Sequence, residues 1–421
     1  MISKGCQRWP RLSKRSSPNT ANWAAKNWRA ACNNSPSKPA GFSPLRQRKR
    51  RALTLHSELG RVKLVTDYGQ DPATQQWFSP QQRAWGLAPH QKVTPGLAAK
   101  LGFTALATTS YEQAAAVAAQ WGVTVTDSLI HQQVQRAGER ADQQALVRVA
   151  ASADTPAPQT RPATDALVIM MDGWMLRHRG ADWGLKPAAT AGERVAWQEC
   201  KSAVIYRLHH AVKTKNDRGL LVEKSVVAYQ GEPLEFGRRV QAEARRRGLG
   251  QVNQVYVVAD GGVWIWKLVA DRFPAAAGVL DFYHASQHLW AVAHTLHPEE
   301  DTAARAWVEP LLHQLLHGEE TKVLQTLHDL PTWCAQRAQR VPPSVATETQ
   351  YFENHREHIR YATRAAEGCP VGSGAMESFC AQLQGRFKRC GQFWTEPGRR
   401  RLMALEIARR NQDWHQVWQQ N

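Results

Sequence analysis

The run ALVIMMDGWMLRH, residues 166–178, is apolar enough for a buried β-strand and carries Asp172 followed by glycine. A second run, VNQVYVVAD at residues 252–260, has the same character and ends in Asp260, which is again followed by glycine. Short runs of β-branched and aromatic residues bounded by glycine are typical of core strands. The sequence therefore predicts two core strands, each of which ends in an aspartate.

The segments around these two runs extend the pattern to a whole domain. Further strands are predicted at 195–210, 220–231 and 276–284, and helices at 234–247, 261–273 and 285–297. The first three strands are joined by short loops, which favours an antiparallel meander. The order β-β-β-α-β-α-β-α predicts an α/β, ribonuclease H-like core in which the first and fourth strands are neighbours. Residues 299–366 are predicted to be a helical insertion, and 397–418 a last arginine-rich helix.

The N-terminal part has a different composition. Residues 1–52 contain no acidic residue and end in the basic run Arg46–Arg51, so this segment is predicted to be weakly ordered and able to touch phosphates, or else to have no role. The runs within 53–80 predict a small β-hairpin. Residues 151–164, ASADTPAPQTRPAT, have the composition of a linker.

Residues 94–147 have helical periodicity, and 110–140 predict two helices separated by a turn at Gly122. Ser110 and Thr126 are the candidate N-caps. Such a pair has the spacing of a helix-turn-helix, whose second helix would expose Gln132 and Arg136 toward base edges. The alternative is a helical hairpin with a packing role only. Residues 53–150 are accordingly assigned to an N-terminal DNA-binding region.

The composition restricts the class of protein. The chain has 421 residues, 43% of them hydrophobic, and a formal net charge of +18, which favours a polyanionic partner such as nucleic acid. The seven cysteines form no C-x-x-C pair, as expected for free thiols in a reducing compartment. We find no apolar run long enough for a membrane span and no signal-peptide core, so a cytoplasmic, nucleoid-associated protein is expected.

Three acidic residues are candidates for catalysis. Asp172 and Asp260 follow strands that are expected to pair, and Glu377 opens a helix after the turn Gly372–Gly374. Phosphodiester transfer by two divalent ions needs carboxylates that converge from separate elements, and Mg²⁺ prefers such oxygen ligands. The three residues are therefore predicted to be catalytic and to bind two Mg²⁺ or Mn²⁺ ions. The alternative is that the D-G pairs only mark turns, and that Glu377 only complements a helix dipole.

Two further groups surround these carboxylates. Asp281 ends the last predicted strand, and His284 follows on the next helix, so both are expected to support the site. Four residues after Glu377 are predicted to contact DNA, by ion pairing or by stacking: Arg386, Lys388, Arg389 and Trp394. The alternative is that the aromatic residues cap the core and the charges are solvated.

These motifs, as a set and in this order, resemble bacterial insertion-sequence transposases of the DDE type, in the ISKra group related to Mutator-like elements. The resemblance is carried by MDG at 171–173, by residues 236–249 and 257–268, by VLDFYHASQHLW at 279–290 and by PVGSGAMESFCAQLQGRFKRCGQFW at 370–394. It covers 165–421, and 53–147 loosely. The family's usual Cys-x-x-Cys zinc element is absent from YGQDPATQQWF, residues 68–78.

The resemblance implies a ribonuclease H-like core divided into 165–298 and 367–421. It implies two Mg²⁺ ions on Asp172, Asp260 and Glu377, cleavage at transposon ends in double-stranded DNA and joining of the freed 3′-hydroxyl to target DNA. A homo-oligomer on DNA is expected. The alternatives are a ribonuclease H-like nuclease or resolvase without joining, and a non-catalytic DNA-binding regulator.

Overall fold

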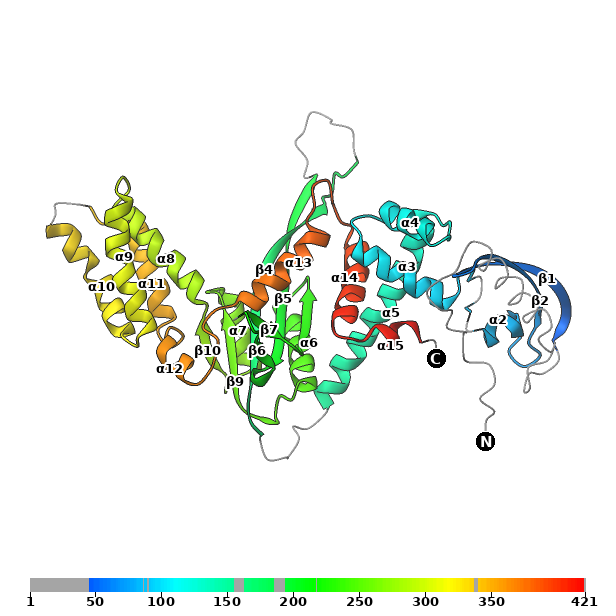
Figure 1. Cartoon of the computed structure of the whole chain (residues 1–421), viewed down its shortest axis with the longest axis horizontal. Coiled ribbons are helices and arrows are strands. Elements are labelled where there is room, and N and C mark those ends of the chain that lie inside the picture. The colour runs from blue at the N-terminus through cyan, green and yellow to red at the C-terminus, as the bar shows by residue number, and fades with distance from the viewer. Residues whose placement is uncertain are drawn as a thin grey trace. The chain divides into compact units, whose positions relative to one another are not determined.

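The computed structural model describes residues 45–85, 87–88, 91–154, 163–184, 194–216, 218–336 and 340–419. The chain forms two compact units, one comprising residues up to 137 together with 415 onward, the other residues 138–414 (Figure 1). Within the described ranges, none of the helices combines the length and the apolar character needed to cross a lipid bilayer.

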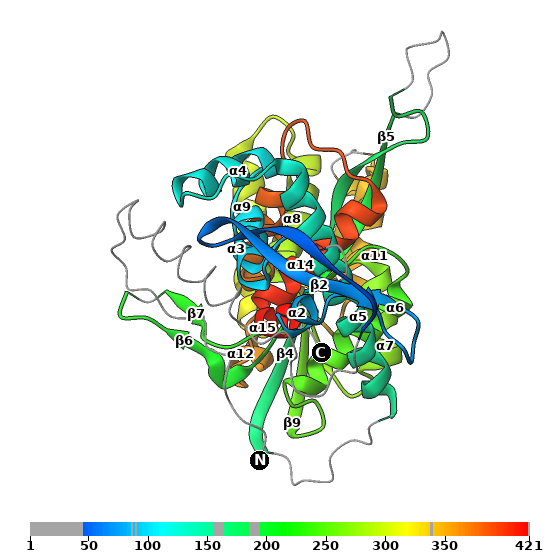
Figure 2. The same ribbon diagram turned by 90° about the vertical axis from the view of Figure 1, so that its right-hand side faces the viewer.

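The first unit begins with an antiparallel hairpin of β1 (Arg46–Ser57) and β2 (Gly60–Gln70), to which the short β3 (Trp77–Phe78) is added. Figure 2 shows this hairpin as a long curved ribbon. Gly60 closes the turn with a φ of 90°, and Leu55, Val62 and Leu64 form the buried side. The predicted hairpin is therefore confirmed.

The prediction of a weakly ordered segment is wrong for its basic end, Arg46–Arg51, which is ordered as a strand. Arg46–Arg51 belongs to β1, because the backbone of this run pairs with β2, as in Arg50 opposite Asp67. Arg48 also forms an ion pair with Asp67 at 2.8 Å. Residues 1–44 lie outside the described residues.

Four helices follow the hairpin: α2 (Pro80–Ala84), α3 (Pro95–Ala107), α4 (Tyr111–Gln120) and α5 (Asp127–Asp154). The Ser110 hydroxyl caps α4 by accepting a hydrogen bond from the Gln113 N–H, and Thr126 accepts one from the Leu129 N–H. Both predicted N-caps are confirmed. The predicted linker at 151–164 starts too early, because α5 continues to Asp154; residues 155–162 lie outside the described residues.

The second unit is built on a five-stranded mixed sheet in the order β10-β9-β4-β5-β8. Its strands are β4 (Ala163–Arg179), β5 (Val195–Arg207), β8 (Ser225–Tyr229), β9 (Val252–Ala259) and β10 (Ala277–Leu280). Strands β4, β5 and β8 are antiparallel, whereas β9 pairs in parallel with both β4 and β10. The predicted meander and the pairing of the first and fourth strands are confirmed, and the α/β arrangement is consistent with a ribonuclease H-like core.

One small element was not predicted. The turn η1 (Leu208–His210) leads into a two-stranded ribbon of β6 (Ala211–Lys213) and β7 (Gly219–Leu221). This ribbon shortens the two strands expected at 195–210 and 220–231, because the chain leaves the main sheet at Arg207 and returns only at Ser225.

Helices cover both faces of the sheet. On one face, α6 (Pro233–Arg246) and α7 (Val263–Arg272) bury Phe236 and Leu268 against Ile169 and Met171. Side chains alternate along a strand, so Asp172 faces the opposite side, where Cys380 of α13 (Gly374–Phe387) contacts it. The carboxylate therefore lies on the face that α13 covers.

Residues 299–366 are mostly helical, as predicted, in α9 (Asp301–Leu316), α10 (Glu320–Gln336), α11 (Pro343–Asn354) and α12 (Tyr361–Ala366). They gather with α8 (Phe282–Leu296) beyond β10 (Figure 1). That this group is an insertion into the core stays a prediction. The predicted helix at 397–418 is two helices, α14 (Glu396–Arg410) and α15 (Trp414–Trp418), because Gln412 between them has a φ of 64°.

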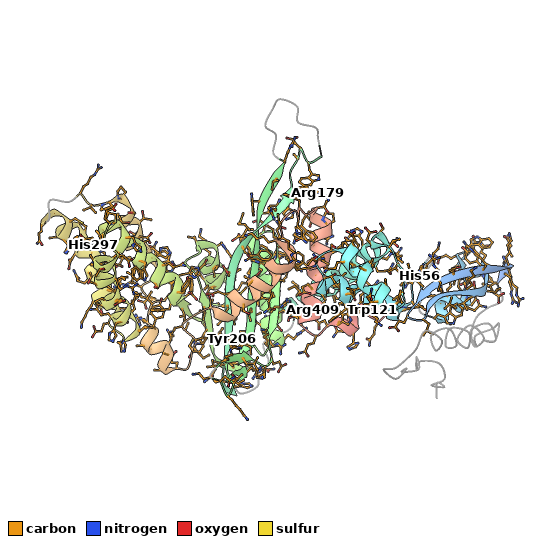
Figure 3. All side chains as sticks on the ribbon, turned by 45° about the horizontal axis from the view of Figure 1, so that its top comes forward. His56, Trp121, Arg179, Tyr206, His297 and Arg409 are labelled. Atoms are coloured by element: carbon orange, nitrogen blue, oxygen red, sulfur yellow. The ribbon has the colours of Figure 1, made fainter. Side chains whose placement is uncertain are left out.

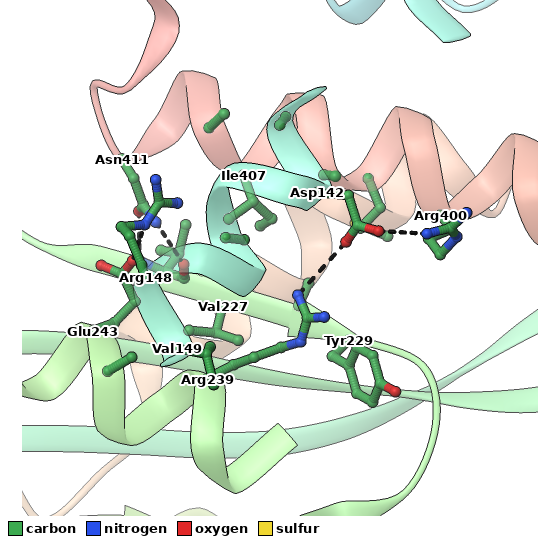
Figure 4. Close-up of a pocket in the computed structure, with 18 of the residues that line it drawn as sticks. Asp142, Arg148, Val149, Val227, Tyr229, Arg239, Glu243, Arg400, Ile407 and Asn411 are labelled. Atoms are coloured by element: carbon green, nitrogen blue, oxygen red, sulfur yellow. Dashed lines mark hydrogen bonds and ion pairs between the residues drawn. The ribbon is translucent and has the colours of Figure 1, made fainter. Parts of the chain in front are cut away.

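The arginines of α14 are bound by carboxylates of the same unit. Asp142 on α5 is 7% exposed at its side chain and forms ion pairs with both Arg400 and Arg239, around a cavity of about 70 Å³ (Figure 4). Arg401 pairs with Glu139 at 2.6 Å, and Arg409 and Arg410 pair with Glu406. Much of the arginine stripe therefore stabilises helix packing.

Candidate active site

Three aspartates lie at one level of three neighbouring parallel strands. Met171 of β4 pairs with Ala259 of β9, and Ala259 pairs in turn with Leu280 of β10. The residues that follow these three are Asp172, Asp260 and Asp281. Because the carboxyl ends of parallel strands meet at one edge of a sheet, the aspartates form a row across that edge.

The expected strand end at Asp172 is wrong in one respect. Strand β4 continues to Arg179 because β5 still pairs with it, with Asp172 opposite Ser202 and Gly173 opposite Lys201. Gly173 therefore makes no turn. Only the parallel pairing with β9 stops before Asp172. At Asp260 the expectation of a turn is confirmed, because the chain leaves β9 there and enters α7 through Gly261 and Gly262.

The Asp172 carboxylate is half-buried and lies near another carboxylate. Its Oδ1 accepts a hydrogen bond from the Gly173 N–H at 2.7 Å, and its Oδ2 is 3.6 Å from the Sγ of Cys380. Burial raises the pKa of Asp172, and the negative charge of Asp260 raises it further. The Asp260 carboxylate is oriented by the Gly262 N–H, which donates to its Oδ1 at 3.0 Å. This pair of carboxylates suits a cation, because a positive charge between them would relieve their repulsion.

Asp281 is fully buried, and both of its oxygens are used within the protein. Its Oδ1 caps α8 by accepting from the His284 N–H at 3.0 Å and also contacts the His284 Nδ1 at 3.2 Å. Its Oδ2 accepts a hydrogen bond from the backbone N–H of Ser373. Burial would raise the pKa of Asp281, but the hydrogen bonds from His284 and Ser373 outweigh burial and lower it to about 2. Asp281 is therefore an ionised carboxylate that connects the start of α8 to Ser373, the residue before α13.

His284 lies at the same edge of the sheet. Its contact with Asp281 raises its pKa, and the charges of Asp260 and Asp172 raise it further. His284 in turn lowers the pKa of both Asp172 and Asp281. His288, one helical turn after His284, shares a hydrogen bond with Glu348 and stacks on Tyr351 at 3.7 Å between ring centroids.

Glu377 lies in the first turn of α13 with its side chain exposed. Cys380, which contacts Asp172, follows one helical turn later on the same helix. Helical residues three apart lie on one face, so Glu377 lies on the side of α13 that carries Cys380, and its charge acts on that thiol. Among the described residues, however, no three His, Cys, Asp or Glu side chains are grouped closely enough to hold a metal ion as they stand. A divalent ion held by Asp172, Asp260 and Glu377 therefore stays a prediction.

The four predicted DNA contacts at the end of α13 divide into two pairs. Lys388 and Arg389 are exposed. Arg386 is only 8% exposed, and the Trp394 indole N–H donates to the carbonyl oxygen of Phe387 at 2.7 Å. The partly buried Trp394 therefore agrees with the alternative interpretation, in which the aromatic residues cap the core. Arg386 is buried, which neither interpretation predicted.

The backbone beside Trp394 continues the sheet in a way that was not predicted. Trp394 exchanges hydrogen bonds with β4, donating to the Arg177 carbonyl at 3.1 Å and accepting from the Arg179 N–H at 3.0 Å. Arg177 lies over the rings of Trp197 and Phe393. Figure 3 labels Arg179, which lies toward the end of the hairpin formed by β4 and β5. The mixture of arginine and tryptophan in 174–183 was the sequence signal that could have found this basic and aromatic surface.

Gln132 and Arg136 lie on α5 in the first unit, and both side chains are exposed. Ile130 and Val134 on the same helix are fully buried. The helix therefore has the buried and exposed sides that were predicted. The reading of bases by its exposed side stays a prediction.

Comparisons with known proteins give little. No protein-family model matches the chain, and no curated protein matches it. Among solved structures, a Drosophila P element transposase strand transfer complex matches with a TM-score of 0.34 and 9% sequence identity, over 75% of this chain and 92% of that chain. A TM-score of this size does not establish a shared fold.

Proposed function

We propose that the protein is a DNA transposase that uses Asp172, Asp260 and Glu377 to cleave and join phosphodiester bonds. The observation that carries the proposal is the half-buried Asp172 carboxylate beside Asp260, at the end of paired parallel strands. A carboxylate whose pKa is perturbed by burial and by a neighbouring charge is characteristic of catalytic sites. The resemblance of the motifs to DDE transposases supports the choice of reaction.

Asp172 and Asp260 would hold two divalent ions, with Glu377 as a further ligand from α13. When bound, Mg²⁺ or Mn²⁺ supplies charge stabilisation at the phosphate and activation of the attacking water or 3′-hydroxyl. The protein's own groups orient these ligands. The Gly262 N–H holds the Asp260 carboxylate, and Asp281 fixes the start of α13 through Ser373. His284 would support the ionised forms of Asp172 and Asp281, because it lowers the pKa of each.

The partner is double-stranded DNA. The net charge of +18 favours a polyanion, and exposed Lys388 and Arg389 would contact phosphates beside the acidic edge. In the first unit, the exposed basic residues of β1 and the exposed side of α5 would bind transposon ends. We expect the protein to act as a homo-oligomer on DNA in the bacterial nucleoid.

A strand-transfer assay tests the proposal. The substrate is DNA from either side of the protein's own gene, incubated with a target plasmid and Mg²⁺. We expect nicked and joined products from the wild-type protein. We expect neither from Asp260→Asn, which should still bind DNA because this variant removes a charge from the metal site only.

Other outcomes identify the alternatives. Nicked DNA without any joined product would favour a nuclease or resolvase. DNA binding that is indifferent to chelator, with no change in the DNA, would favour a regulator. Full activity of Asp260→Asn would refute the assignment of the site.

A further inference from the structure

A large open pocket starts at the residue directly after Asp260. It has a volume of about 870 Å³ and lies between α7 and α11 of the second unit. Its lining includes the backbone of Gly261 and the side chains of Trp266, Lys267, Gln350 and Tyr351. Ligand pockets for organic molecules typically span about 300–1,000 Å³, so the pocket has room for a nucleotide.

The aromatic walls of the pocket are held in place by contacts behind them. The Trp266 indole N–H donates to the carbonyl oxygen of Asp260 at 2.9 Å, and its ring stacks on His358 at 3.9 Å between centroids. Tyr351 approaches Gly261 so closely that a Cβ at position 261 would lie 2.2 Å from the tyrosine ring. The Trp266 ring is therefore held by the backbone of Asp260, and the Tyr351 ring packs against Gly261.

The polar groups of the pocket suit the edge of a base and its phosphate. Gln350 and Asn354 both line the pocket, and the Gln350 amide donates to the Asn354 side-chain oxygen at 2.9 Å. Side-chain amides carry both donors and acceptors, as base edges do. Lys267 at the rim is exposed, and none of the described residues that line the pocket is acidic. Lys267 is therefore the candidate contact for a phosphate, on a pocket whose Tyr351 also lies in the field of Asp260, Glu348 and Asp281.

We propose that this pocket binds one unpaired base of the DNA strand that lies at Asp260, with Trp266 as the stacking surface and Lys267 on the adjacent phosphate. The inference rests on the proposed function, because that function places DNA at this edge. Aromatic side chains bind bases of single strands by stacking, which contributes about 1–3 kcal/mol per base. Helix α11 would thus form one wall of the site that binds the DNA strand, and α7 would form the other.

The test compares two single-stranded oligonucleotides of equal length and charge, one with bases and one abasic throughout its centre. Both carry fluorescein, and binding is measured by anisotropy in EDTA, so that no catalysis contributes. We expect the wild-type protein to bind the base-containing strand at least about 5-fold more tightly, as stacking of one base implies. Trp266→Ala should abolish this preference, Trp266→Phe should keep most of it, and Lys267→Ala should weaken binding of both strands alike.

A second variant guards against misfolding of Trp266→Ala. Ala346 is exposed on α11 and lines the pocket, so Ala346→Leu fills the pocket from a helical position that tolerates leucine. We expect it to lose the base preference. Ala306→Leu, at an exposed position of α9, is the matched control and should keep it.

The failures are distinguishable. Equal binding of both strands by the wild-type protein, or an unchanged preference in Trp266→Ala and Ala346→Leu, would overturn the pocket and leave the transposase proposal standing. If the wild-type protein bound neither strand nor duplex DNA, both proposals would fail together.

Discussion

The Asp281 carboxylate accepts a hydrogen bond from the backbone N–H of Ser373, which lies 92 residues later in the chain. Ser373 is the N-cap of α13, the helix that carries Glu377, and the Phe282 N–H reinforces the junction by donating to the Val371 carbonyl at 3.0 Å. The bond therefore ties the edge of the sheet to the start of the helix that would supply the third carboxylate. Asp281 is thus a positioning residue.

Asp281→Asn should lower both stability and activity, because an amide cannot accept hydrogen bonds at both of its polar atoms. The folded-state pKa of Asp281 is about 2, below its ordinary value of 3.8. A depressed pKa contributes stability that is present above about pH 4 and is lost as the pH falls toward 2. We expect Asp281→Asn to cost about 2 kcal/mol of unfolding free energy at neutral pH.

Urea unfolding of both proteins at neutral pH and at successively lower pH measures this difference. It should shrink as the pH approaches 2. A difference that stays constant over that range would show that the Asp281 charge is not what stabilises the junction.

Gly138 is expected to be a packing residue. A Cβ there would lie 2.1 Å from the carbonyl oxygen of Arg401 on α14, which is backbone and cannot give way easily. Gly138→Ala should therefore lower the free energy of unfolding by about 1–3 kcal/mol, as overpacking does. Gly385, in α13, has open space around it, so Gly385→Ala should raise stability by up to about 1 kcal/mol. Thermal unfolding compares the two, and equal effects would contradict the packing of α5 on α14.

The hairpin of the first unit should bind DNA through phosphates. Lys49 and Arg50 are exposed on β1, and a two-stranded ribbon fits the major groove. Lys49→Ala and Arg50→Ala should each weaken binding to all duplex sequences alike and reduce the slope of log K against log salt by about 1, because one phosphate fewer is neutralised. Lys322→Ala, at an exposed position on α10, is the control. An unchanged slope in both hairpin variants would exclude a phosphate contact there.

The exposed side of α5 should contribute sequence specificity instead. Arg136→Ala and Gln132→Ala should cost about 1–3 kcal/mol with the cognate end sequence and little with random DNA. Competition binding with cognate and random duplexes measures this ratio. Equal losses on both duplexes would indicate that α5 contacts only the DNA backbone, or that these residues serve the helical hairpin alone.

The parts of the fold that follow from local pattern were predictable. Apolar runs indicated β4 and β9, and Ser110 and Thr126 marked the helix starts correctly, because these signals depend on neighbours in sequence. The continuation of β4 past Asp172 was not predictable, because it depends on pairing with β5. The ribbon of β6 and β7 was missed for the same reason.

The candidate site shows the same division. The apolar runs before Asp172 and Asp260, with the predicted pairing of the first and fourth strands, placed the two aspartates at one level of the sheet. The hydrogen bond from Ser373 to Asp281, the burial of Arg386 and the backbone pairing of Trp394 with β4 could not be read from spacing. Each results from contacts between segments far apart in the chain, and a basic or aromatic residue has the same appearance in sequence whether it faces solvent or the core.

The most direct measurement of metal binding at the row of aspartates is a calorimetric Mn²⁺ titration of the wild-type protein, Asp172→Asn, Asp260→Asn and the control Asp271→Asn, whose carboxylate is exposed on α7 and paired with Arg272. We predict Mn²⁺ binding by the wild-type protein and the control, and a loss of affinity of at least about 10-fold in each of the other two variants, as removal of a ligating carboxylate requires. Equal Mn²⁺ affinity in all four proteins would contradict a metal site on Asp172 and Asp260.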